Sequence, residues 1–300
     1  MSLPAPVRRR IEARYGPVRG AHPVGGGCVA PALRLELTDG PAFLKYAGRP
    51  AAGVFPAEAR GLEALRRAAE EGLRVPAVLA SFCPEAEGAA GEPGWILMEW
   101  IEPGERGPGC DERLGRGLAA LHRTAEGRWG WEEDNFIGPL PQPNAVAPTW
   151  AEFWRDRRLE PQLRRARDAG HAPGGARDWE RLLARLPDLL APAAEDGPSL
   201  LHGDLWSGNA LASFAGEPCL VDPAVFRGHR EVDLAMAELF GGFSPRFHAA
   251  YHEAWPLLPG YREGRRPAYQ LYYLLVHVNL FGAGYVAGTR AALHEALSAS

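Results

Sequence analysis

Two acidic segments in the second half of the chain hold the residues whose types and spacing could do chemistry. Asp204 and Asn209 lie five positions apart in residues 202–209, which read HGDLWSGN, and Asp222 follows thirteen positions after Asn209. Short apolar runs precede both aspartates, so the two carboxylates can face one cleft if these runs are neighbouring strands. Carboxylate and amide oxygens suit Mg²⁺ because phosphate oxygens and water complete its octahedron. The spacing therefore predicts a metal and proton-transfer site.

Kinases use the same residue types in the same order. Their catalytic loop contains an Asp that accepts the proton of the substrate hydroxyl, an Asn that holds one Mg²⁺, and a following Asp that holds another. On this pattern Asp204 is the catalytic base, and Asn209 and Asp222 are the metal ligands. The tripeptide at 202–204 alone is more often a turn with a capping Asp, so the prediction depends on the longer string.

Lys45 is the one lysine among 33 basic residues. Arginine stands wherever either base would serve, so this lysine marks a position where a planar guanidinium would not fit, unless it is a surface lysine that survived by chance. Lys45 lies in residues 41–47, the last of three expected strands that begin with 18–24 and 29–37. We expect it to contact ATP phosphates.

A glycine turn and two further elements complete a small lobe around this lysine. Gly25, Gly26 and Gly27 come between the first two expected strands, where a glycine-rich loop can cover phosphates. The usual G-x-G-x-x-G pattern is absent, which leaves the contacting glycine open. Residues 55–71 have helical spacing, and residues 76–82 and 94–100 read as two more strands.

The boundary between two lobes is expected just after the last of these strands. Residues 1–98 would form the nucleotide-binding lobe, 99–104 a hinge, and 105–300 a mostly helical catalytic lobe. Backbone groups of the hinge would pair with adenine, although an ordinary edge strand would look the same. The adenine-contacting candidates are Met98, Glu99, Trp100 and Ile101.

The segment after Asp222 is too short to regulate a protein kinase. Only seven residues separate Asp222 from Arg230, which leaves no room for an activation segment that carries a phosphosite and docks a peptide. We therefore expect a constitutively assembled small-molecule kinase. Asp233 is expected to brace the catalytic loop, and residues 268–286 to form one long apolar helix beside the acceptor site.

Composition excludes several other classes of protein. A hydrophobic content of 46% over 300 residues can bury a sizeable core, and a net charge of −4 gives no basic field for nucleic acid. The apolar stretch at 268–286 contains Gln270, His277 and Asn279, which fits a buried helix better than a membrane span. No signal-peptide pattern opens the chain, so the expected location is the cytoplasm.

The string HGDLWSGN closely resembles the signature of the fructosamine kinase (ketosamine 3-kinase) family, which belongs with the aminoglycoside and choline phosphotransferases. Residues 134–138 and 222–235 resemble the same family. The resemblance implies a bilobal α+β fold of the protein-kinase type, with a small antiparallel-sheet lobe and a larger helical lobe. It also implies ATP and Mg²⁺ as cofactors, and a pair between Lys45 and Glu58 that aims the lysine at the phosphates.

By that resemblance the reaction is phosphorylation of the 3-hydroxyl of a ketosamine, a deglycation repair step. Trp206 offers a face on which the sugar and a positive amine could rest, although its ring could equally be packed structurally. The alternatives are a related kinase acting on an aminoglycoside, choline or homoserine, and a non-catalytic nucleotide-binding regulator.

Cysteine usage suggests one further hypothesis. The four cysteines are scattered without a C-x-x-C pair, which favours neither a zinc site nor a disulfide framework. Cys28 follows the glycine turn, where amide donors can lower a thiol pKa. The chain would then be a monomer, or a redox-dependent homodimer joined through Cys28.

Overall fold

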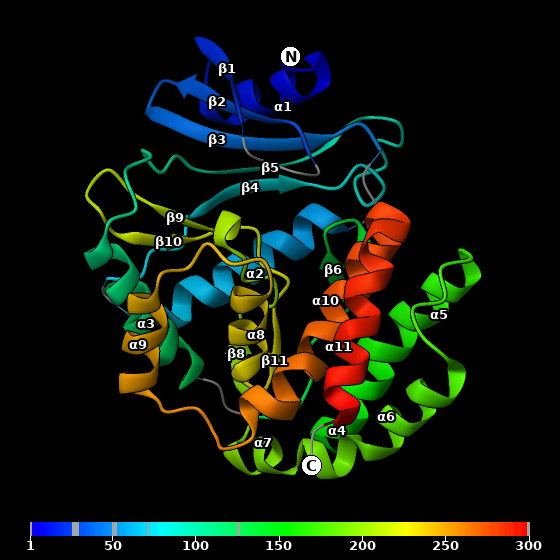
Figure 1. Cartoon of the computed structure of the whole chain (residues 1–300). Coiled ribbons are helices and arrows are strands. Elements are labelled where there is room, and N and C mark those ends of the chain that lie inside the picture. The colour runs from blue at the N-terminus through cyan, green and yellow to red at the C-terminus, as the bar shows by residue number, and fades with distance from the viewer. Residues whose placement is uncertain (1, 26–29, 50–52, 71, 125–126, 299–300) are drawn as a thin grey trace.

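A five-stranded antiparallel sheet lies across one end of a larger, mostly helical body (Figure 1). The computed structural model describes the chain apart from residues 1, 26–29, 50–52, 71, 125–126 and 299–300. The strand order of the sheet is β1-β2-β3-β5-β4. Its strands are β1 (Gly20–Val24), β2 (Ala32–Leu37), β3 (Gly40–Ala47), β4 (Val78–Phe82) and β5 (Gly94–Glu99).

Alternation along β3 gives the sheet two different faces. Ala42, Leu44 and Tyr46 are buried on one face, where they pack with Val7 and Ile11 of helix α1 (Ala5–Tyr15). Because successive side chains of a strand point to opposite faces, Lys45 lies on the other face. The covered face is thus the core of the small lobe, and the lysine face is turned toward the rest of the molecule.

Helix α2 (Val54–Ala68) connects the sheet to the helical body. Phe55, Leu62 and Leu65 recur at helical spacing and are buried against the larger core. Gly61 lies one turn after Glu58, and an added Cβ there would be 2.8 Å from Cγ2 of Val225. The missing side chain therefore allows α2 to lie close to the segment that follows Asp222.

The helical body is built around short strand pairs and long helices. β8 pairs antiparallel with β11, and β9 pairs antiparallel with β10. These strands are β8 (Ser199–Leu201), β9 (Ala210–Ala212), β10 (Pro218–Leu220) and β11 (Phe226–Gly228), with β6 (Asn135–Ile137) and β7 (Leu140–Gln142) nearby. The helices are α3 (Pro108–His122), α4 (Trp150–Phe153), α5 (Glu160–Asp168), α6 (Ala176–Leu189), α7 (Ala191–Asp196), α8 (Glu231–Leu239), α9 (Pro245–Ala254), α10 (Arg266–Phe281) and α11 (Val286–Ser298).

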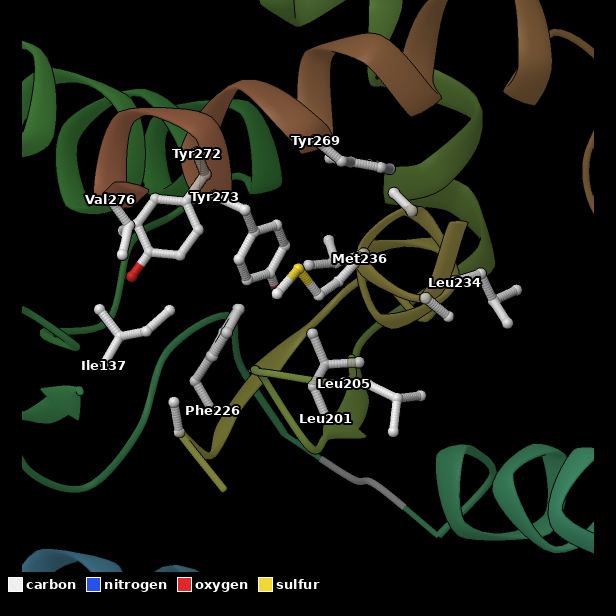
Figure 2. Packing of buried hydrophobic residues seen from close by; sticks show 14 of the residues in the cluster. Ile137, Leu201, Leu205, Phe226, Leu234, Met236, Tyr269, Tyr272, Tyr273 and Val276 are labelled. Carbon is white, nitrogen blue, oxygen red and sulfur yellow. The ribbon is translucent and has the colours of Figure 1, made fainter. Parts of the chain in front are cut away.

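Helix α10 is the central helix of this body. Figure 2 shows Tyr272 and Tyr273 extending from α10 into the core, with Met236 of α8 beside the Tyr273 ring. The prediction of one helix over 268–286 is wrong at its end, because α10 ends at Phe281. Gly282 has φ +81°, and four residues of 3₁₀-helix then lead into α11.

The combined helical run from Tyr261 to Ser298 is long and apolar enough to cross a membrane by length and composition, because an 18-residue stretch of it has a mean hydropathy of 1.2. That criterion is also met by core helices of soluble proteins. Ten of the sixteen residues of α10 are buried inside the body, and Gly282 interrupts the run. The structure therefore places α10 in the core of the larger lobe.

The predicted bilobal α+β fold is confirmed, with its small antiparallel-sheet lobe and its larger helical lobe. All five predicted strands of the small lobe form. Within the described residues, their ends differ from the predicted ends by up to three residues. The boundaries at 98, 99–104 and 105 stay a prediction.

Candidate active site

Three charged side chains from both lobes meet where the small lobe rests on the large one. Lys45 Nζ on β3 donates to Glu58 Oε1 of α2 at 2.9 Å and to Asp222 Oδ1 at 3.0 Å. The lysine and glutamate side chains are each only 13% exposed. Burial lowers the pKa of Lys45, but the two carboxylates outweigh burial and raise it above its ordinary value. Lys45 is therefore a fixed positive charge at this junction.

Asp222 is held in a backbone conformation that few side chains adopt. Its φ is +55°, the one positive φ of a non-glycine residue among those described. Asp tolerates this left-handed region better than most residues. Val221 before it donates its N–H to Asn209 O at 3.0 Å, which ties the Asp222 segment to the catalytic loop.

Asn209 lies between the two aspartates. Its Nδ2 donates to Asp204 O at 2.9 Å and is within 3.3 Å of Asp204 Oδ2 and 3.4 Å of Asp222 O. Within the described part of the chain, no donor reaches Asn209 Oδ1 or Asp222 Oδ2. An amide fixed through its nitrogen leaves its oxygen for a cation, and the neighbouring carboxylate adds negative charge. This donor set fits Mg²⁺ held jointly with phosphate oxygens.

Asp204 is a carboxyl group in an apolar and negative environment. Burial, and then the negative charge of Asp222, raise its pKa to about 7, against the lowering effect of the Asn209 hydrogen bond. A carboxylate with a pKa near neutrality is suited to accept a proton from an alcohol. Asp204 therefore has the properties of a general base.

His202 orients the backbone around Asp204 and Asp222 together. Its Nε2 donates to Val221 O at 2.8 Å, and its Nδ1 accepts from Asp204 N at 3.3 Å. Burial lowers the pKa of His202, which fits a neutral ring with one donor and one acceptor nitrogen. The histidine thus joins the two acidic segments through their backbone.

Asp233 of α8 braces the catalytic loop, as predicted. Its Oδ2 accepts the His202 N–H at 2.7 Å and its Oδ1 accepts the Gly203 N–H at 2.9 Å. His122 Nε2 lies 3.1 Å from the same carboxylate, and both side chains are fully buried. The carboxylate is fully buried and engaged by these donors, which fits a bracing role rather than a contact with the substrate.

Gly203 is held from a third side. Tyr273 OH of α10 donates to Gly203 O at 2.9 Å. Gly203 has φ +80°, and a Cβ at this position would lie 2.0 Å from Ala224 O. Neither the contact of Tyr273 nor a role for Gly203 was predicted from the sequence. The Gly61 contact with Val225 was also missed, because a helical glycine gives no signal of its partner.

The hinge candidates are partly occupied by protein contacts. The Glu99 N–H donates to Ala77 O at 2.8 Å, so this group is not free to contact adenine. Met98 is 3% exposed and packs in the large core. Trp100 packs 6.3 Å from the Phe43 ring and donates its Nε1–H to Glu102. Their roles toward adenine stay predictions.

The remaining candidates are only partly described. Gly25 is exposed directly after β1, whereas Gly26, Gly27 and Cys28 lie outside the described residues. The Trp206 ring folds over Gly208, where an added Cβ would lie 2.2 Å from the indole. Trp206 is half-buried in that position, and its contact with a sugar stays a prediction.

Comparisons with known proteins identify the family of the chain. The family model described as fructosamine kinase matches residues 7–299. A probable ketoamine kinase of Synechocystis is 40% identical over 264 residues, which are 87% of this chain and 85% of that protein. A chloroplastic protein-ribulosamine 3-kinase of Oryza sativa is 37% identical over 289 residues, which are 93% of this chain and 80% of that protein.

Solved structures extend the likeness to the fold. A Thermobifida fusca protein assigned to the fructosamine-3-kinases is 37% identical, with a TM-score of 0.81 and coverage of 97% of this chain and 98% of that chain. The aminoglycoside phosphotransferase APH(4)-Ia, at 16% identity and a TM-score of 0.59, covers 98% of this chain and 99% of that chain and shows the kinase-like fold alone. Because the family model spans nearly the whole chain, the chain belongs to the fructosamine kinase family.

Proposed function

We propose that the chain transfers the γ-phosphoryl group of ATP to the 3-hydroxyl of a ketosamine, as a deglycation step. Membership of the family makes it a kinase that acts on a hydroxyl group. The observation that carries the proposal is the meeting of Lys45, Glu58 and Asp222 within 3.0 Å across the two lobes. Asn209 connects Asp204 to this group, because its side-chain amide contacts both Asp204 and the Asp222 backbone.

Each residue has a task that its position supports. Lys45, oriented by Glu58, would hold the α- and β-phosphates, and the Asp204 carboxylate would orient the sugar hydroxyl and take its proton. Asn209 and Asp222 would hold Mg²⁺, which supplies positive charge against the transferring phosphoryl group. Catalysis is then positioning and charge stabilisation at a site assembled before substrate binds.

The acceptor is assigned by family rather than by pocket shape. The relatives are named ketoamine and ribulosamine kinases, which favours a ketosamine over an aminoglycoside, choline or homoserine. The intact set of Lys45, Asp204, Asn209 and Asp222 speaks against a non-catalytic nucleotide-binding regulator.

The test is turnover of the purified protein with ATP and MgCl₂. The acceptor panel contains fructosamine, ribulosamine and erythrulosamine adducts, each on a free amino acid and on a peptide, with an aminoglycoside, choline and homoserine beside them. We expect ADP release with at least one ketosamine, a 3-phosphate product by phosphorus NMR, and loss of turnover after chelation of the metal. Faster turnover of any non-ketosamine acceptor would refute the assignment.

A further inference from the structure

Four aromatic rings gather at the surface of the large lobe, and we name them the aromatic cluster. His277 is at the centre, with its ring centroid 4.5 Å from that of Phe240, 4.9 Å from Tyr285 and 5.5 Å from Phe281. Phe240 remains 40% exposed and Phe281 58% exposed. The four residues come from the end of α8, from α10 and from the turn that follows α10. Large exposed rings packed on one another form an apolar surface that a ligand can cover.

The aromatic cluster borders the catalytic loop on the side of α10. Tyr273 connects the two, because its hydroxyl donates to Gly203 O while its own carbonyl accepts the His277 Nδ1–H at 2.8 Å. His277 is four residues beyond Tyr273, which is about 6 Å along the helix. The cluster therefore begins one helical turn from the tyrosine whose hydroxyl contacts the backbone of the catalytic loop.

The segment after Phe240 touches the catalytic loop as well. Gly242 lies against Ser207, since an added Cβ would be 2.3 Å from Ser207 Oγ. Gly241 and Gly242 have φ values of +68° and +89°, which turn the chain at this point. Phe240 thus lies two residues from the contact with Ser207, before a turn that only glycines adopt easily.

The chemistry of the cluster is neutral and apolar. Burial lowers the pKa of His277, so its ring is uncharged at neutral pH and donates only through Nδ1 to the Tyr273 carbonyl. Exposed ring faces attract aliphatic chains through burial of apolar area. In a ketosamine three carbons, C1 to C3, separate the nitrogen from the oxygen of the reacting 3-hydroxyl. A chain attached to that nitrogen extends beyond the reacting atoms, and the aromatic cluster is an exposed apolar surface on the border of the same loop.

We propose that the aromatic cluster binds the aliphatic chain attached to the ketosamine nitrogen. The site thereby prefers ketosamines formed on amines with an extended carbon chain, such as a lysine side chain, over those formed on short amines. This inference rests on the proposed function, because it assigns the amine-side part of the same acceptor site.

The test compares two ketosamines that share one sugar, one made on methylamine and one on butylamine. Binding is measured by calorimetry to the full chain with a non-hydrolysable ATP analogue and MgCl₂. We expect the butylamine adduct to bind about tenfold more tightly, roughly half of the transfer of three methylenes from water. F281A should remove this preference and leave the affinity for the methylamine adduct unchanged.

The matched control is F214A, because Phe214 is 82% exposed at the tip of the β9–β10 hairpin and lies outside the cluster. It should keep the full preference. Equal affinity of the unmodified chain for both adducts, or a preference that survives F281A, would overturn this inference alone. Absence of binding by either adduct, across all sugars of the panel, would overturn the proposed function together with it.

Discussion

The phosphate end and the proton-transfer end of the site are held in different ways. At the phosphate end, Lys45, Glu58 and Asp222 contact one another directly through side chains that come from both lobes. At the proton-transfer end, the loop that carries Asp204 is fixed through its backbone by buried groups of the large lobe. The first arrangement depends on how the lobes meet, and the second on the packing of one core.

This difference predicts which substitutions lower turnover, which lower the stability of the fold and which weaken the affinity for ATP. A change to Asp204 should remove chemistry without loosening the loop that holds it. A change to the backbone of the loop should cost stability first. A change at the lobe junction should show mainly in the affinity for ATP.

Asp204→Asn is expected to have the largest effect. Turnover should fall by roughly 10² to 10⁴-fold, the range of a lost general base. Affinity for an ATP analogue, measured by calorimetry, should stay nearly intact, because the Asn209 amide still binds the backbone of residue 204. Turnover within a few-fold of the unmodified chain would remove Asp204 from this role.

Gly203→Ala should destabilise the fold by about 3 kcal/mol, through a strained positive φ and overlap with Ala224 O. The free energy of unfolding is measured by urea titration. Gly197→Ala is the matched control, since Gly197 also has a positive φ, +89°, but open space around its Cα. Equal losses in the two variants would show that the contact with Ala224 contributes nothing.

Lys45→Arg should raise the KM for ATP about tenfold although the charge is kept. A guanidinium cannot place one nitrogen within 3.0 Å of both Glu58 and Asp222 in the way that an ammonium does. Steady-state kinetics measure the effect, with Arg67→Lys as the control, because the Arg67 side chain is 75% exposed on α2. An unchanged KM and rate would contradict this account of the one lysine.

Gly61→Ala should have the smallest effect of the four substitutions. It should raise the KM for ATP although alanine is the better helix former. Alanine favours the helix by about 1 kcal/mol, yet its Cβ would press on Val225 and displace Glu58 on the same helix. We expect a KM for ATP raised about threefold, a change below 1 kcal/mol. Val225→Ala in the same chain should restore the KM, and a failure to do so would disconnect α2 from the Asp222 segment.

Part of the site was predictable because its residues are local in sequence or unusual in composition. Asp204 and Asn209 are fixed by a five-residue spacing, and Lys45 is identified by the absence of any other lysine. The glutamate partner and Asp233 were also named from the sequence, with family resemblance for the first. Their contacts across 13 and about 30 positions then depend on packing that the spacing does not contain.

Other contacts were not predictable, because no local signal identifies them. Tyr273 reads as one of several tyrosines on an apolar helix, and only the approach of α10 to the loop gives its hydroxyl a partner. The break at Gly282 was missed because the apolar pattern continues on both sides of it. The aromatic cluster likewise joins residues that are 45 positions apart, from Phe240 to Tyr285.

The sequence by itself determined the chemical groups: one ammonium, two acidic segments and an amide at a fixed spacing between them. The sequence determines these groups because the charge, the size and the ligand preference of a side chain do not depend on where the residue lies in the fold. Only the tertiary structure decided which groups touch, because contacts between lobes and between α8, α10 and the catalytic loop depend on long-range packing of buried side chains and backbone hydrogen bonds.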